Sequence, residues 1–192
     1  MCIRAFCKDW NKMHNWYIFR TLGAADPAQL AREAAAAGCE SYIPTFTRRQ
    51  DYIDEDGRTV VEQVYPALPG SLFVRTDAAG LSRIRDAFSG RALLCRDADG
   101  QPCRVAGETI VLIKYALHCS GGEVRFLPAL DSRLCRGELA RIDAGPLAGV
   151  TGYVKRIRKD RKFLVPIGSY SLLMLPRSLW NPVKTARTSF IG

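Results

Sequence analysis

The fold of this chain is decided by residues 137–165, GELARIDAGPLAGVTGYVKRIRKDRKFLV. Apolar and polar residues alternate over 139–144, which is the period of two expected of a half-buried strand. Gly145-Pro146 ends this strand, and Gly149 and Gly152 bracket a short turn before a second strand. Glycines so placed predict a chain that reverses within a few residues, where a positive φ or a close backbone approach excludes a Cβ atom.

A basic run follows the turn, with six Lys and Arg residues over 155–162 and Asp160 predicted at a hairpin tip. Taken alone, this pattern also fits a generic β-hairpin with solvated charges. The full order is more restrictive: Gly-acid, alternating apolar residues, Gly-Pro-Leu, Gly-x-x-Gly and then basic residues. It resembles the KOW motif of bacterial NusG-type transcription elongation factors and of several ribosomal proteins. We therefore interpret the stretch as a KOW module.

Charge is distributed unevenly along the chain. From Gly137 onward the sequence holds ten Lys and Arg against three Asp and Glu, whereas the first 136 residues hold eighteen against sixteen. A basic C-terminal module on a nearly neutral body predicts a polyanionic neighbourhood, for which nucleic acid or a machine that handles it is the natural candidate. Charge alone gives proximity and not sequence recognition.

Composition excludes several other classes of protein. No run of about 18 apolar residues predicts a membrane span, and the first 14 residues lack the apolar centre of a secretory signal, so we expect a cytoplasmic protein. The seven cysteines form no Cys-x-x-Cys pair and only two histidines accompany them, which favours free thiols over a zinc site. No nucleophile elbow or phosphate-binding glycine loop occurs, so we expect a protein without enzymatic activity, cofactor or metal. We also expect a monomer.

The part that precedes the KOW module alternates predicted strands and helices. Asp26-Pro27 is a typical helix start, and Asp56-Gly57 marks a hairpin turn. Strands are expected at 16–19, 41–44, 59–65, 71–74 and 92–95, and helices at 27–37, 77–88 and 106–117. This order predicts an α+β fold in which helices pack on an antiparallel sheet.

Three segments of this part are similar to landmarks of the NusG N-terminal (NGN) domain: WYIF at 16–19, YIPTFTRRQ at 42–50 and LPGSLFVRTD at 68–77. The resemblance implies an extension, an NGN domain, a linker, a KOW domain built as a five-stranded SH3-like barrel, and a tail. The corresponding residues are 1–14, 15–118, 119–136, 137–183 and 184–192. The chain looks more like the specialised paralogs, the group that includes RfaH, LoaP and the UpxY regulators, than like the general factor.

The resemblance implies that an apolar concavity of the NGN domain binds the clamp helices of the largest RNA polymerase subunit. Carried over by position, this concavity includes Leu22, Leu68, Pro69 and Ser71, with Tyr17 and Phe73 behind it. The family has aromatic residues at the positions of Leu68 and Ser71. A short polar motif at Ser82 and Arg83 corresponds to a second contact, with the other large subunit. The alternatives are that Tyr17 and Phe73 are core residues and that Ser82 and Arg83 belong to a solvated helical turn.

Two further surfaces follow from the resemblance. Sequence-reading paralogs contact the non-template DNA strand, for which the candidates here are Arg20, Arg32, Arg48 and Arg49. The KOW domain implies contact with Rho or with a ribosomal protein of the small subunit, and the candidate residues are Leu147, Val150, Lys155, Arg156 and Arg158. The alternatives are solvated surface for the charged residues and the barrel rim for Leu147 and Val150.

The sequence thus predicts a transcription elongation or antitermination factor. It is expected to bind RNA polymerase and to suppress pausing and termination on a long operon, such as a surface polysaccharide locus. Two alternatives stay open: an RNA-binding or ribosome-associated KOW protein, and a general NusG that cooperates with Rho. The low net charge of residues 1–136 argues against an RNA-binding N-terminal part.

Overall fold

The computed structural model describes residues 15–54, 57–120, 123–128, 138–145, 147–157, 159–167, 171–176 and 183–185. Its described residues form two compact units. The first unit comprises 15–45 and 68–111, and the second comprises 46–67 together with the described residues from 112 onward. Helices and antiparallel sheets both occur, so the predicted α+β class is confirmed.

The first unit is built on an antiparallel sheet with the strand order β2-β5-β1-β6, and β7 also pairs with β1. These strands are β1 (Asn15–Thr21), β2 (Glu40–Tyr42), β5 (Ser71–Thr76), β6 (Ala92–Leu94) and β7 (Arg104–Val105). Residues 16–19 of β1 are all buried. A run that is apolar on both faces of the strand is typical of a central strand, which is the place that β1 takes.

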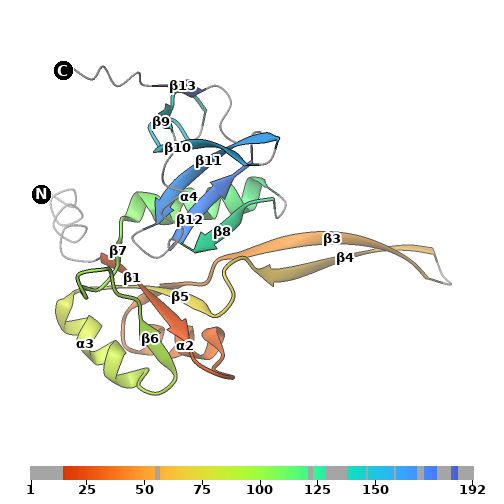
Figure 1. Cartoon of the computed structure of the whole chain (residues 1–192). Helices are drawn as coiled ribbons and strands as arrows, with labels where there is room; N and C mark the ends of the chain where they lie inside the picture. Colours follow the sequence, from red (N-terminus) through yellow and green to blue (C-terminus); the bar gives the residue numbers. More distant parts are fainter. Residues whose placement is uncertain are drawn as a thin grey trace, which may run out of the picture. The chain divides into compact units, whose positions relative to one another are not determined.

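Two helices cover one face of this sheet, α2 (Pro27–Ala36) and α3 (Ala78–Ala87) (Figure 1). Each begins after an aspartate that satisfies an otherwise unpaired backbone N–H: the Asp26 carboxylate accepts from Ala28 N at 2.9 Å and that of Asp77 accepts from Gly80 N at 2.7 Å. In the core beneath the helices, the Phe19 ring packs edge-on against the Phe88 ring, with 5.2 Å between the ring centroids.

Helix α4 (Gly107–Cys119) spans the division between the units. Ile110, Ile113 and Leu117 are buried as their spacing predicts, whereas Lys114 is exposed. Among the described residues, no helix is both long enough and apolar enough to cross a membrane.

A long two-stranded ribbon forms the start of the second unit, as Figure 1 shows. It consists of β3 (Thr45–Asp54) and β4 (Gly57–Pro66), which pair with no other strand of the described chain. The hairpin predicted around Asp56-Gly57 is therefore confirmed, although residues 55 and 56 lie outside the described part. Gly57 has φ 130°, which explains a glycine at the start of β4.

The remainder of the second unit contains a six-stranded antiparallel sheet with the order β13-β9-β10-β11-β12-β8. Its strands are β8 (Arg125–Pro128), β9 (Glu138–Ile142), β10 (Thr151–Ile157), β11 (Asp160–Ile167), β12 (Ser171–Leu175) and β13 (Val183–Thr185). Ala140 and Ile142 are buried and alternate with exposed Leu139 and Arg141, as the period of two predicts.

The glycines of the deciding stretch have the two roles predicted for them. Gly145 has φ 83° and Gly149 has φ 89°, a region that favours glycine. Gly152 instead permits a close approach, because a Cβ atom there would overlap the carbonyl oxygen of Leu164 and lie 2.9 Å from the Phe163 ring. This approach brings β10 tightly against β11.

The sheet of the second unit differs from the prediction in four respects. Residues 125–128, predicted as linker, form β8 and pair with β12. The described strands make an open path of six, whereas a closed barrel of five was expected. Ile157 pairs with Asp160, so Asp160 is the first residue of β11 and not the tip of the hairpin. Strand β13 also crosses the predicted boundary, because it begins at Val183 of the predicted KOW domain and includes the first two residues of the predicted tail.

Candidate functional site

The turn at residues 68–71 shapes one end of the first unit's sheet. Ser71 N donates to Leu68 O at 3.2 Å, and Gly70 has φ 68°, so Leu-Pro-Gly-Ser forms a type II turn with proline and glycine in their preferred places. Thr21 N donates to Gly70 O at 2.8 Å. These bonds fix Leu68 and Pro69 beside the end of β1, next to Leu22.

Four apolar residues at this end form a surface that we call the apolar end patch. Leu22 is 38% exposed and Leu93 is 59% exposed, while Pro69 is exposed and Leu68 half-buried. Leu93 and Ser71 both pair with Arg20 of β1, which places β6 and the 68–71 turn at the same end of the sheet. The patch thus contains three of the predicted contact residues together with Leu93.

Tyr17, Ser71 and Phe73 do not belong to this surface, because they are 3%, 1% and 0% exposed. Tyr17 pairs with Val74 and lies in the core beneath the helices. Phe73 pairs with Ile18 on the opposite face of the sheet, where its ring lies 6.1 Å from that of Tyr42. The expectation that Tyr17 and Phe73 lie behind one hollow is therefore wrong, since their side chains point to opposite faces.

A hollow beside Leu93 was not predicted. It has a volume of about 300 Å³ and lies between β6 and the last turn of α3, with Arg85, Leu94 and Arg96 among its lining residues. Arg91 holds the segment that leads into it, because its guanidinium donates to both oxygens of Glu33 at 2.7 and 2.6 Å. The sequence pattern could not identify this hollow, since Ala92–Leu94 predicts only a short strand.

Ser82 and Arg83 are exposed on α3, and Ser82 Oγ donates to Ala78 O at 3.5 Å. The next residue, Ile84, is 1% exposed and belongs to the core. The two polar residues therefore lie on the solvent side of an amphipathic helix. They are available for a contact, but nothing in the helix distinguishes them from other solvated residues.

The four predicted nucleic-acid-binding arginines do not make one surface. Arg20 lies on the face of β1 opposite the helices, whereas Arg32 lies on α2, which covers the other face. Arg48 and Arg49 belong to β3 of the second unit. All four side chains are exposed.

Arg48 forms a compact group with two aromatic rings on the ribbon. The rings of Phe46 and Tyr65 stack with 5.7 Å between centroids, and the guanidinium carbon of Arg48 lies 5.9 Å from each centroid. Arg49 instead pairs with Glu62 at 2.6 Å. An exposed guanidinium over an aromatic pair offers both charge and a flat surface for stacking, so Arg48 is the better placed of the two arginines for nucleic acid.

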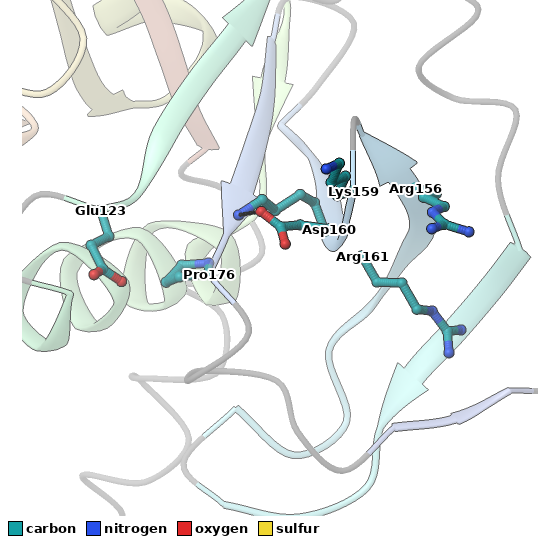
Figure 2. Close-up of a pocket in the computed structure, with 7 residues that line it drawn as sticks. Glu123, Arg156, Lys159, Asp160, Arg161 and Pro176 are labelled. Carbon is teal, nitrogen blue, oxygen red and sulfur yellow. Dashed lines mark ion pairs between the residues drawn. The ribbon is translucent and has the colours of Figure 1, made fainter.

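The residues predicted to bind a partner of the KOW module differ in their exposure. Leu147 is 4% exposed and therefore buried, so it offers no surface to a partner; the alternative given for it was the barrel rim. Val150 and Lys155 are half-buried and Arg156 is exposed, whereas Arg158 lies outside the described residues. A hollow of about 580 Å³ lies at the end of the β10–β11 hairpin, and Arg156 is among the residues that line it. Figure 2 shows how these residues lie.

The pKa shifts of the titratable side chains arise from ion pairing and burial. The Arg91 hydrogen bonds lower the pKa of Glu33, and burial raises the pKa of Tyr42 to about 12. Within the described part of the chain, no group of three or more His, Cys, Asp or Glu residues is arranged to hold a metal ion. Cys39, Cys95, Cys103 and Cys119 form no disulfide, and of these four only Cys119 is exposed.

Alkylation should separate these thiols. Burial, with a smaller contribution from Cys103, raises the pKa of Cys95 to about 11. The thiolate is the reactive form, so iodoacetamide at pH 8 is expected to label Cys119 quickly and Cys95 hardly at all, as measured by peptide mapping of the native protein. Labelling in urea is the control and should make the two rates similar. Equal rates in the native protein would contradict this assignment.

No family model matches the chain, and no curated protein matches it.

Proposed function

We propose that this protein is a non-enzymatic transcription elongation or antitermination factor. In this proposal, the first unit binds RNA polymerase at the clamp helices of its largest subunit, as an NGN domain does, and the second unit contains a KOW domain. The protein suppresses pausing and termination on a long operon in the cytoplasm. Arg48 on the ribbon contacts the non-template DNA strand.

The apolar end patch supports the proposal most directly. The hydrogen-bonded 68–71 turn presents Leu68 and Pro69 next to Leu22, and Leu22 and Leu93 are among the few large apolar side chains that stay exposed in the described chain. Rigid, exposed apolar surface is suited to receive an amphipathic helix. The patch lacks the aromatic side chains that dominate many interfaces, so the contact relies on aliphatic residues.

Charge placed in this patch should weaken polymerase binding. Leu22→Glu and Leu93→Glu are each expected to reduce the affinity for a purified elongation complex about tenfold, because a carboxylate buried in an apolar contact loses its hydration. Fluorescence anisotropy with a labelled protein measures the affinity.

Val111→Glu is the matched control, because Val111 is also an exposed aliphatic residue, at 66%, and lies on α4 outside the patch. The control should bind as the unmodified protein does. Equal weakening by all three substitutions, or none by the two in the patch, would remove the patch from the interface. A polymerase that ignores the unmodified protein would refute the proposed function itself.

An RNA-binding or ribosome-associated role is the second candidate, and the Arg48 group and the basic β10–β11 hairpin favour it. Affinity capture from lysate distinguishes the two, since polymerase subunits support the first and ribosomal RNA with ribosomal proteins the second. A Rho-dependent termination assay separates a specialised factor, which opposes termination, from a general factor that assists Rho.

A further inference from the structure

The β10–β11 hairpin pairs like charges across its two strands. Lys155 lies directly opposite Lys162, and Arg156 lies directly opposite Arg161. Like charges in such positions destabilise a hairpin, whereas opposite charges would stabilise it. The two pairs point to opposite faces of the hairpin. Each opposes folding on its own face, and an anion beside Arg156 and Arg161 relieves the repulsion of that pair.

The end of this hairpin also lines the hollow of about 580 Å³. We call Arg156, Lys159, Arg161 and Lys162 the cationic hairpin end. Figure 2 shows the guanidinium groups of Arg156 and Arg161 on the same side of the hairpin, with the Asp160 carboxylate on the other side. The register agrees, because Asp160 pairs with Ile157 and so alternates in orientation with Arg156 and Arg161.

Nearby carboxylates neutralise this group only weakly. Arg161 lies 3.5 Å from Glu138 and Lys162 lies 3.7 Å from Asp160, and three of the four side chains are about half exposed or more. Exposed ion pairs of this length contribute little and exchange readily. Arg156 and Lys159 have no ion-pair partner in the described part of the chain, and Glu123 is the other acidic residue that lines the hollow.

The lining distinguishes two classes of anionic partner. Protein interfaces usually bury aromatic or aliphatic anchors at their centre, but Pro176 is the one apolar residue among the described residues that line this hollow. Nucleic-acid interfaces are more polar and strongly positive. Arginine forks also match phosphate oxygens in a bidentate geometry.

We propose that the cationic hairpin end binds the phosphates of a single-stranded RNA, with Arg156 and Arg161 on one phosphate group and Lys159 on the next. Contact with phosphates gives affinity without sequence preference. The inference rests on the proposed function only for the source of the strand, a transcript beside the polymerase. Binding itself requires no polymerase.

Anisotropy of a labelled 20-nucleotide RNA of mixed sequence, titrated with the full chain at several salt concentrations, tests the inference. A plot of log affinity against log salt has a negative slope, and for single strands each lost phosphate contact should make it shallower by about 0.7. At 0.1 M salt, this corresponds to a loss of about fivefold in affinity. Arg156→Gln with Arg161→Gln should therefore lose at least fivefold, and Lys159→Gln should lose a similar factor. Circular dichroism confirms that each variant is folded.

Arg141→Gln is the matched control, since Arg141 is an exposed arginine on β9 that does not line the hollow. Unchanged binding by the double variant, or loss equal to that of the control, overturns the proposal. Displacement of the RNA by polyglutamate of equal charge as readily as by unlabelled RNA also overturns it, in favour of an acidic protein. Binding to single-stranded DNA and to duplex DNA of equal length is measured in the same way. Tighter binding of either DNA than of the RNA overturns the assignment of single-stranded RNA as the ligand.

The same variants separate this inference from the proposed function. If the double variant loses RNA and still binds the elongation complex, both stand. If the unmodified chain binds RNA through these residues but not polymerase, the inference survives and the proposed function fails.

Discussion

Replacing Phe88 with alanine is expected to lower the free energy of unfolding of the first unit by about 4 kcal/mol, the largest effect of any change considered for this chain. Phe88 is fully buried at the end of α3, and its ring packs edge-on against Phe19 of β1. Its removal deletes the apolar contact between helix and sheet and leaves a cavity that the close-packed interior cannot fill.

Native-state hydrogen exchange of the β1 and β5 amides, followed by mass spectrometry, measures this loss separately from the second unit. Phe88→Leu is the control and should cost about 1.5 kcal/mol, because it keeps most of the buried volume. The packing argument fails if the alanine variant is as stable as the leucine variant, or if β10 and β11 lose protection to the same extent as β1.

Gly152→Ala is expected to destabilise the second unit by about 3 kcal/mol, at the upper end of the range for overpacking. The new methyl group would overlap the backbone oxygen of Leu164 and crowd the Phe163 ring. Backbone cannot rotate away as a flexible side chain can, and Phe163 is fully buried. Strands β10 and β11 must then separate, and the hydrogen bonds between them weaken.

Gly145→Ala separates this steric effect from backbone strain. Gly145 has φ 83° with no atom within 4 Å of an added Cβ, so alanine there should cost only about 1 kcal/mol, from the left-handed conformation. Urea unfolding followed by exchange at the β10 and β11 amides compares the two variants. A Gly152→Ala protein no less stable than the Gly145→Ala protein would show that the strands can move apart freely.

Local features of this fold are largely predictable from the sequence. Asp26-Pro27 begins a helix because the side-chain cap and the fixed φ of proline act within one turn. Gly145 and Gly149 likewise reflect the positive φ of their own backbone. In each case the energetic cause lies within a few residues of the signal.

Features that depend on pairing between distant segments were not predictable. Strand β8 is only four residues long and is held by β12, more than forty positions later in the chain. Alternation separates the two faces within β1 or β5, but only the register between them shows that Tyr17 and Phe73 point in opposite directions. The like-charge pairs of the β10–β11 hairpin also depend on a register that its turn determines.

The apolar end patch was predicted in part for the same reason. Leu22, Leu68 and Pro69 follow from motifs that are local in sequence, whereas Leu93 joins them only through pairing with Arg20. Exposure of a leucine is a tertiary property, since composition and periodicity indicate where apolar residues occur and not which of them stay uncovered.

The β3–β4 ribbon has a consequence for the behaviour of the protein at high concentration. In the described chain neither of its outer edges is covered by another strand, so both present backbone donors and acceptors that a second molecule can use as a template. Val60 and Val64 add exposed β-branched residues, at 54% and 65%. Intermolecular strand addition should therefore begin here, and it must desolvate or break the Arg49–Glu62 ion pair.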